Sequence, residues 1–118
     1  GAEDKALSEY ERVTAATRAA KELAKERGCV VLLLSQFNRQ LRPDERPKMS
    51  HLKGSGSIEQ DADAVGLLHV KPVDGVDYEG IPVDLIIAKQ RNGPTGIVGL
   101  TFMREYTRFE ARAEGMLI

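Results

Sequence analysis

Two cationic side chains toward the C-terminal end of the chain have the types and the spacing to act on a phosphate. Lys89 and Arg91 follow the apolar run Ile86–Ala88, and the Gly-rich stretch Asn92–Gly96 then reverses the chain. Because side chains alternate across a strand, Lys89 and Arg91 are expected to point one way and Gln90 the other. Rigidly held cations stabilise the charge that builds on a phosphoryl group during transfer. The alternative is a solvated turn, where Lys and Arg are common.

A neutral amide and a lysine beside glycines form two further candidate sites. Gln36 follows an apolar run, and ligands of open α/β sheets bind at the carboxyl ends of strands, where an amide can sense a phosphate. A cation next to accessible backbone N–H groups suits a phosphodiester contact without base readout. That combination occurs at Lys53, Gly54, Ser55 and Gly56. The alternatives are a capping role for Gln36 and a plain linker for the glycine segment.

The elements that must position these residues follow from hydrophobic spacing. Apolar residues three or four apart predict an amphipathic helix at 8–27, with a capping box at Ser8 and Glu11 and a stop at Gly28. The unbroken apolar run at 29–35 predicts a strand covered on both faces, as in a parallel sheet. A helix followed by such a strand is the second half of a βαβ unit, so we expect the chain to be the tail of something longer.

The rest of the chain is expected to form a loop, a strand and a hairpin. Residues 36–57 are polar and rich in Pro and Gly, which predicts a long loop, and 64–70 predicts another buried strand. Alternating apolar residues on both sides of a Gly-rich turn predict a β-hairpin at 81–103. The predicted fold class is therefore α/β, with a terminal antiparallel hairpin and all of 1–118 in one partial domain.

Composition limits the classes of partner. The 118 residues carry 17 Lys and Arg against 18 Asp and Glu, so any nucleic acid must be held by a local patch rather than by bulk charge. The single Cys29 excludes an intrachain disulfide and fits a reducing compartment, and no apolar segment is long enough for a membrane span, so we expect a cytoplasmic protein without a membrane partner. Glu59, Asp61 and Asp63 lack the Gly and the final Glu of a calcium loop, so no metal site is predicted.

Three separated stretches together resemble one family. They are Ser35–Arg39, Gly54–Asp63 and Ile87–Gly96 with Tyr106–Phe109, and they closely resemble the C-terminal portion of the DnaB-type replicative DNA helicases in order and spacing. The resemblance implies a RecA-like P-loop ATPase fold and a homohexameric ring around single-stranded DNA. It implies ATP and Mg²⁺ as cofactors, ATP-driven unwinding, and a primase and a helicase loader as candidate partners.

The resemblance also assigns roles. Gln36 is similar to the sensor glutamine that couples the γ-phosphate to the DNA loop, and Lys53 to Gly56 match the DNA-binding loop. Lys89 and Arg91 resemble the lysine and arginine finger that reach ATP on the neighbouring subunit. The segment with Tyr106 and Arg108 resembles the stretch near the nucleotide base.

The chain departs from the family pattern in two places. The family usually has Arg-Glu-Ser-Gly where this chain has Lys53-Gly54-Ser55-Gly56. Lys53 in place of the arginine keeps the positive charge but loses the planar guanidinium. The phosphate-binding Gly-x-x-x-x-Gly-Lys-Ser/Thr loop and the Mg²⁺-supporting Asp are absent, so this chain alone is not expected to hydrolyse ATP. The alternatives are part of a RecA-like recombinase or clock-type ATPase, or a nucleic-acid-binding module that never hydrolyses ATP.

Overall fold

A computed structural model describes the backbone of residues 8–71 and 80–117 and the side chains of these residues up to 112. The chain divides into two compact units, which are described separately. The first contains residues 1–41 and 49–62, and the second contains residues 42–48 and 63–118.

The first unit is built on the helix α1, Glu9–Arg27. The Ser8 side chain accepts a hydrogen bond from the Glu11 backbone N–H at 3.2 Å, and the Ser8 hydroxyl donates to the Glu11 carboxylate at 3.0 Å. Gly28 ends the helix in the left-handed region, at φ 60°. The capping box and the glycine stop place this helix where its sequence predicts it, at 8–27.

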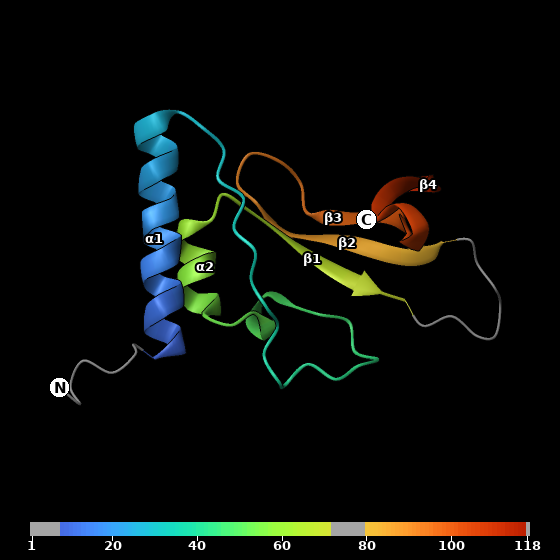
Figure 1. The fold of residues 1–118 in the computed structure, drawn as a ribbon, viewed down its shortest axis with the longest axis horizontal. Coiled ribbons are helices and arrows are strands. Elements are labelled where there is room, and N and C mark those ends of the chain that lie inside the picture. The colour runs from blue at the N-terminus through green and yellow to red at the C-terminus, as the bar shows by residue number, and fades with distance from the viewer. Residues whose placement is uncertain (1–7, 72–79, 118) are drawn as a thin grey trace. The chain divides into compact units, whose positions relative to one another are not determined.

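A second helix, α2 (Ser55–Asp61), lies beside α1 (Figure 1). Two contacts between side chains join the helices: the Thr14 and Ser57 hydroxyls are 2.6 Å apart, and the Thr17 hydroxyl donates to Asp61 at 3.0 Å. A short 3₁₀ turn, η2 (Met49–His51), precedes α2. The expected loop at 36–57 is therefore wrong in part, because packing on α1 stabilises a helix whose Gly- and Ser-rich sequence has little helical propensity of its own.

The predicted buried strand at 29–35 is not formed. These residues have no regular secondary structure, and the side chains of Val30, Leu32 and Leu34 are 94%, 84% and 86% exposed. A parallel strand is buried only when neighbouring strands and helices cover it. Among residues 8–71 and 80–117, no strand pairs with this segment, so the apolar pattern has nothing to be buried against.

The second unit is an antiparallel sheet with the strand order β1-β2-β3-β4. Its strands are β1 (Ala64–Val70), β2 (Ile81–Gln90), β3 (Gly96–Met103) and β4 (Arg108–Leu117), with the 3₁₀ turn η3 (Arg104–Tyr106) between the last two. The β2–β3 pair confirms the predicted hairpin. The strand expected at 64–70 is present as β1, but it is an edge strand that buries only Val65 and Leu67, instead of being covered on both faces.

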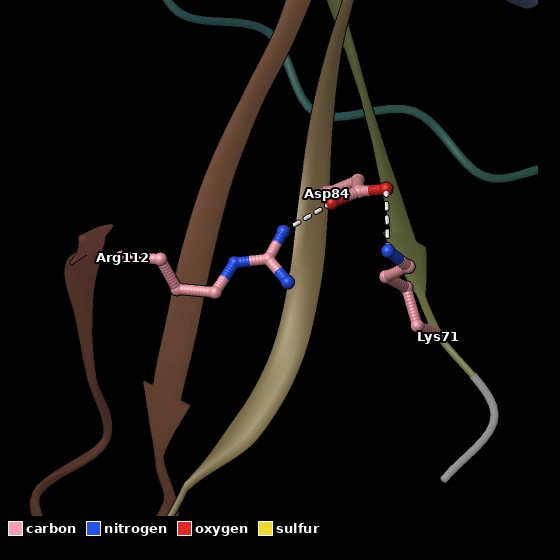
Figure 2. A network of polar contacts seen from close by, with 3 residues as sticks. All are labelled: Lys71, Asp84 and Arg112. Carbon is pink, nitrogen blue, oxygen red and sulfur yellow. Dashed lines mark hydrogen bonds and ion pairs between the residues drawn. The ribbon is translucent and has the colours of Figure 1, made fainter. Parts of the chain in front are cut away.

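A buried carboxylate ties three strands of this sheet together. Asp84 of β2 pairs with Arg112 of β4 and, at 3.9 Å, with Lys71, which follows β1 (Figure 2). The Arg112 guanidinium reaches Asp84 by crossing β3 over Gly99, where a Cβ atom would lie 2.7 Å from Arg112 Nε. Gly99 thus leaves the space that lets β4 and β2 form an ion pair across β3.

Within the described residues, no helix is long and apolar enough to cross a membrane.

Candidate functional site

The β2–β3 hairpin carries both predicted cations at one end of the sheet. Lys89 is opposite Val65 of β1, whereas the next β1 residue, Gly66, is opposite Ile87. Ala88 is therefore an extra residue, a β-bulge directly before Lys89. Because paired residues share a face of the sheet, the bulge turns Lys89 to the face that carries the buried Val65.

Arg91 is the first residue after β2 and is held by Asp63, the residue before β1. The guanidinium Nη1 is 2.8 Å from Asp63 Oδ1, and the Arg91 backbone N–H donates to the Asp63 carbonyl at 2.9 Å. The two side chains are 48% and 61% exposed, so the pair is accessible to a ligand. Since Arg91 lies outside the strand, strand alternation does not determine its direction. The expectation that it points with Lys89 stays a prediction.

Gln36 and Lys53 lie next to each other in the first unit. The Lys53 backbone N–H donates to the Gln36 carbonyl at 3.1 Å, and Lys53 Nζ is 3.5 Å from Gln36 Oε1. A bridge between Phe37 and Leu52 holds the two segments antiparallel. The structure therefore brings together the amide and the lysine that the resemblance assigns to phosphate sensing and DNA contact.

The remaining residues of the predicted DNA loop lead into α2. Gly54 caps the helix at φ 72°, and Ser55 and Gly56 form its first turn. A Cβ atom on Gly56 would have no heavy atom within 4 Å, so this glycine borders open space. Lys53 itself is 3.0 Å from the carboxylate of Glu9 at the start of α1. Its charge is thus partly balanced within its own unit.

Tyr106 and Arg108 form a separate pair after β3. The Arg108 guanidinium lies over the Tyr106 ring, 5.3 Å from the centroid, and Arg108 Nη2 is 2.6 Å from Glu110 Oε1. Thr107 between them has a left-handed φ of 47°, which reverses the chain into β4. An exposed tyrosine beside a cation offers a stacking surface with a positive edge.

The two groups assigned to nucleotide binding lie at opposite ends of β3. Arg91 precedes this strand by way of the hairpin turn, and Tyr106 follows it by way of η3. Eight residues of strand separate them, which corresponds to about 23 Å along the sheet. That distance is long for one nucleotide, so the side chains of Lys89, Arg91, Tyr106 and Arg108 do not form a single compact pocket.

Two partners of these residues were not expected from the sequence. Asp63 as the partner of Arg91 follows from the register, because Ala64 lies opposite Gln90 and the next pair outward is Asp63 with Arg91. An antiparallel pairing of 64–70 with the hairpin would have identified it. No sequence pattern predicts the ion pair between Glu9 and Lys53, because this contact depends on how α1 packs.

The described residues by themselves form no cluster typical of a metal centre. Over residues 8–71 and 80–112, no group of three or more His, Cys, Asp or Glu side chains is arranged to hold one. The cations at the hairpin are of the type that contacts phosphate oxygens.

Comparisons with known proteins agree on one family. A model described as the DnaB-like helicase C terminal domain matches residues 2–111. The replicative DNA helicase DnaB of Geobacillus stearothermophilus is 45% identical over 102 residues, and the replicative DNA helicase DnaC of Bacillus subtilis (strain 168) is 43% identical over 102 residues. Each match covers 84% of this chain but 22% of the relative, so the chain spans about a fifth of the length of these relatives.

Two solved structures share the fold. One, described as an ATPase domain, superposes with a TM-score of 0.75 and 38% identity, covering 92% of this chain and 40% of that chain. A DnaB-like replicative helicase studied for its interactions with primase superposes with a TM-score of 0.71 and 36% identity, covering 90% of this chain and 27% of that chain.

Proposed function

The chain belongs to the DnaB-like helicase C-terminal domain family, and from that membership we propose that it is the C-terminal part of the ATPase domain of a replicative DNA helicase. In this role it couples ATP hydrolysis to the unwinding of duplex DNA by movement on single-stranded DNA. The chain supplies the sensor amide, a DNA-contacting segment and the trans-acting cations, whereas the phosphate-binding loop is supplied from outside residues 1–118.

The observation that carries the proposal is the pair of cations at the end of the β2–β3 hairpin. Lys89 is turned by a bulge, and Arg91 is anchored by backbone and side chain to Asp63. Lys89 lies in β2 and Arg91 directly follows this strand and is held by Asp63, and catalytic cations act best when their supports are rigid. Arg91 reaches the γ-phosphate, where its planar fork stabilises the charge that develops during transfer.

The separation along β3 supports a ring of subunits. Tyr106 and Arg108 lie about 23 Å of strand away from Arg91, too far for both ends to serve one nucleotide. A head-to-tail ring resolves this, because each chain then contacts two nucleotides: the base of its own through Tyr106 and Arg108, and the phosphates of its neighbour's through Lys89 and Arg91. The homohexamer implied by the family has this geometry.

The Gln36–Lys53 contact supports the coupling between nucleotide and DNA. Lys53 contributes one cation to the phosphodiester backbone, and Gly56, where a Cβ atom would meet no heavy atom within 4 Å, allows the strand to approach closely. Gln36 accepts hydrogen bonds from the backbone N–H and the ammonium group of the same lysine. A change at a phosphate that contacts the Gln36 amide is therefore transmitted directly to the DNA contact of Lys53.

The cofactors and partners follow from this role. ATP is the nucleotide, and Mg²⁺ bound by residues outside this chain would neutralise the phosphate charge. Single-stranded DNA is the macromolecular ligand, and primase and a loader are partners of the assembled ring. A cytoplasmic location fits DNA replication in bacteria.

The test is hydrolysis by the full-length helicase with Arg91→Ala. Hydrolysis is expected to fall by about 10³- to 10⁵-fold, while the Kd for ATP stays nearly constant, because a trans-acting finger contributes mainly to the transition state. Arg18→Ala, which removes an exposed cation from α1, is the matched control and should leave both values unchanged. Weaker ATP binding with unchanged hydrolysis per bound ATP would contradict the finger role. Normal activity of Arg91→Ala would instead favour a DNA-binding module that takes no part in hydrolysis.

A further inference from the structure

Asp63 holds Arg91 through two contacts, and we propose that it is a positioning residue for the arginine finger. This inference rests on the proposed function, because it requires that Arg91 act on a phosphate. Asp63 does not touch the nucleotide. Its role is to order the guanidinium before the nucleotide of the neighbouring subunit arrives.

The first argument is the geometry of the contact. The Asp63 carbonyl accepts from the Arg91 backbone N–H at 2.9 Å, and the carboxylate oxygen Oδ1 lies 2.8 Å from Nη1. The same residue therefore fixes both the start and the end of a long, flexible side chain. Because Arg91 follows the last residue of β2, strand alternation does not fix the direction of its side chain, and the carboxylate of Asp63 provides this order.

The second argument is the capacity of the guanidinium. Arg carries five N–H donors in a planar fork, and the contact with Oδ1 involves one nitrogen, Nη1. The opposite edge of the fork can still donate to phosphate oxygens in the two-bond geometry typical of Arg. A carboxylate on one edge and a phosphate on the other is an arrangement that holds the cation without blocking it.

The third argument is that folding alone gives little reason for the pair. With the side chains 48% and 61% exposed, solvent screens the charges, and exposed pairs contribute little to stability. Preorganisation, in contrast, acts on the rate: a side chain already held in place loses less freedom in the transition state. The pair therefore fits a catalytic support better than a fold-stabilising link.

The position of Asp63 in the chain is consistent with this role. Asp63 lies between the C-terminal cap of α2, Ala62, and the first residue of β1, Ala64, which pairs with Gln90. Its backbone is thus fixed by the β1–β2 ladder immediately beside it. The Asp63 carboxylate therefore has a defined position from which it orients the Arg91 guanidinium.

The experiment compares steady-state ATP hydrolysis by full-length Asp63→Asn, Asp63→Glu and wild-type helicase. Asp63→Asn keeps the shape and the backbone contact but removes the charge. We expect its kcat to fall about 3- to 10-fold with KM unchanged, the range expected when one long side chain loses its order. Asp63→Glu should recover part of this loss because it restores the carboxylate. Glu22→Gln, which neutralises an exposed acid on α1, is the matched control and should match wild type.

A double-mutant cycle separates positioning from general stability. If Asp63 acts through Arg91, then Asp63→Asn should cause no further loss in an Arg91→Ala background, since there is no guanidinium left to orient. A further loss of about 3-fold or more would overturn the proposal, as would wild-type kcat in the Asp63→Asn single variant. A raised KM with constant kcat would also overturn it, because that result places the effect on substrate binding.

The outcomes distinguish this proposal from the proposed function. If Arg91→Ala hydrolyses ATP at the wild-type rate, the finger role itself is wrong. If Arg91→Ala is inactive and Asp63→Asn is fully active, the finger role stands and the positioning role of Asp63 is wrong. Thermal unfolding of each variant checks the fold: a large drop in Tm for Asp63→Glu as well as Asp63→Asn would assign Asp63 to folding and overturn the proposal.

Discussion

Removing the charge of Asp84 is expected to loosen the β-sheet that carries the hairpin. Asp84 is 7% exposed and pairs with Arg112, whose side chain is 15% exposed. Asp84→Asn keeps the size of the side chain but leaves the Arg112 guanidinium without a counter-charge. Arg112 Nε is buried without a hydrogen-bond partner, so few other contacts offset the cost of burying the guanidinium charge.

The expected cost follows from the burial of the pair. Removing one partner of a buried ion pair costs about 3–5 kcal/mol, because the remaining charge is left desolvated. The neutral amide can still accept a hydrogen bond, and Lys71, at 3.9 Å and 45% exposed, adds little to the balance. We therefore expect the lower end of this range, about 3 kcal/mol, for Asp84→Asn.

Peptide-resolved hydrogen exchange in the full-length helicase measures this cost locally. A loss of about 3 kcal/mol corresponds to exchange roughly a hundredfold faster in β2 and β4. Glu110→Gln is the matched control, because Glu110 is also paired with an arginine of β4 at 2.6 Å but is 47% exposed. It should cost less than about 1 kcal/mol. Equal exchange rates in the two variants would refute the argument that burial determines the cost.

Two further predictions concern the first unit. Lys53→Ala should weaken binding of single-stranded DNA and reduce the magnitude of the slope of log K against log salt by about 0.7, the value for one phosphate contact. Lys25→Ala on α1 is the control. If the slope for Lys53→Ala is unchanged, Lys53 does not contact the DNA backbone. The isolated 118-residue chain should self-associate through its exposed apolar segment, and Leu32→Asp with Leu34→Asp should reduce that association in sedimentation velocity. A monomeric wild-type chain would contradict this.

Local signals in the sequence were sufficient for the helix and the hairpin. Ser8 and Glu11 cap α1, Gly28 ends it, and the glycines after Arg91 reverse the chain between β2 and β3. These features depend on neighbours within a few residues, so no knowledge of packing is needed to predict them.

Features that depend on distant partners could not be predicted in the same way. The apolar run at 29–35 has the composition of a buried strand, but burial requires pairing partners that the described residues do not provide. The helix α2 is stabilised by contacts of Ser57 and Asp61 with α1, which no local pattern reveals. The strand β4 pairs with β3 through Phe109 and Phe102, whose ring centroids are 4.9 Å apart, although its own sequence has no clear period.

The candidate site shows the same division. The cations at Lys89 and Arg91 were identified from their types and spacing, whereas the bulge at Ala88 and the partner Asp63 required the register of β1 against β2. The separation of Arg91 from Tyr106, in contrast, already follows from the predicted hairpin, whose second strand lies between them.

Mixing two inactive helicases tests most directly whether the hairpin completes a neighbour's nucleotide site. One protein carries Arg91→Ala with an intact phosphate-binding loop, and the other carries a disabled phosphate-binding loop with Arg91 intact. If Arg91 acts across a subunit interface, equal mixing should restore ATP hydrolysis at about a quarter of the interfaces of a head-to-tail ring. If mixed rings form and hydrolysis stays at the level of the separate variants, Arg91 does not act in trans and the account is contradicted.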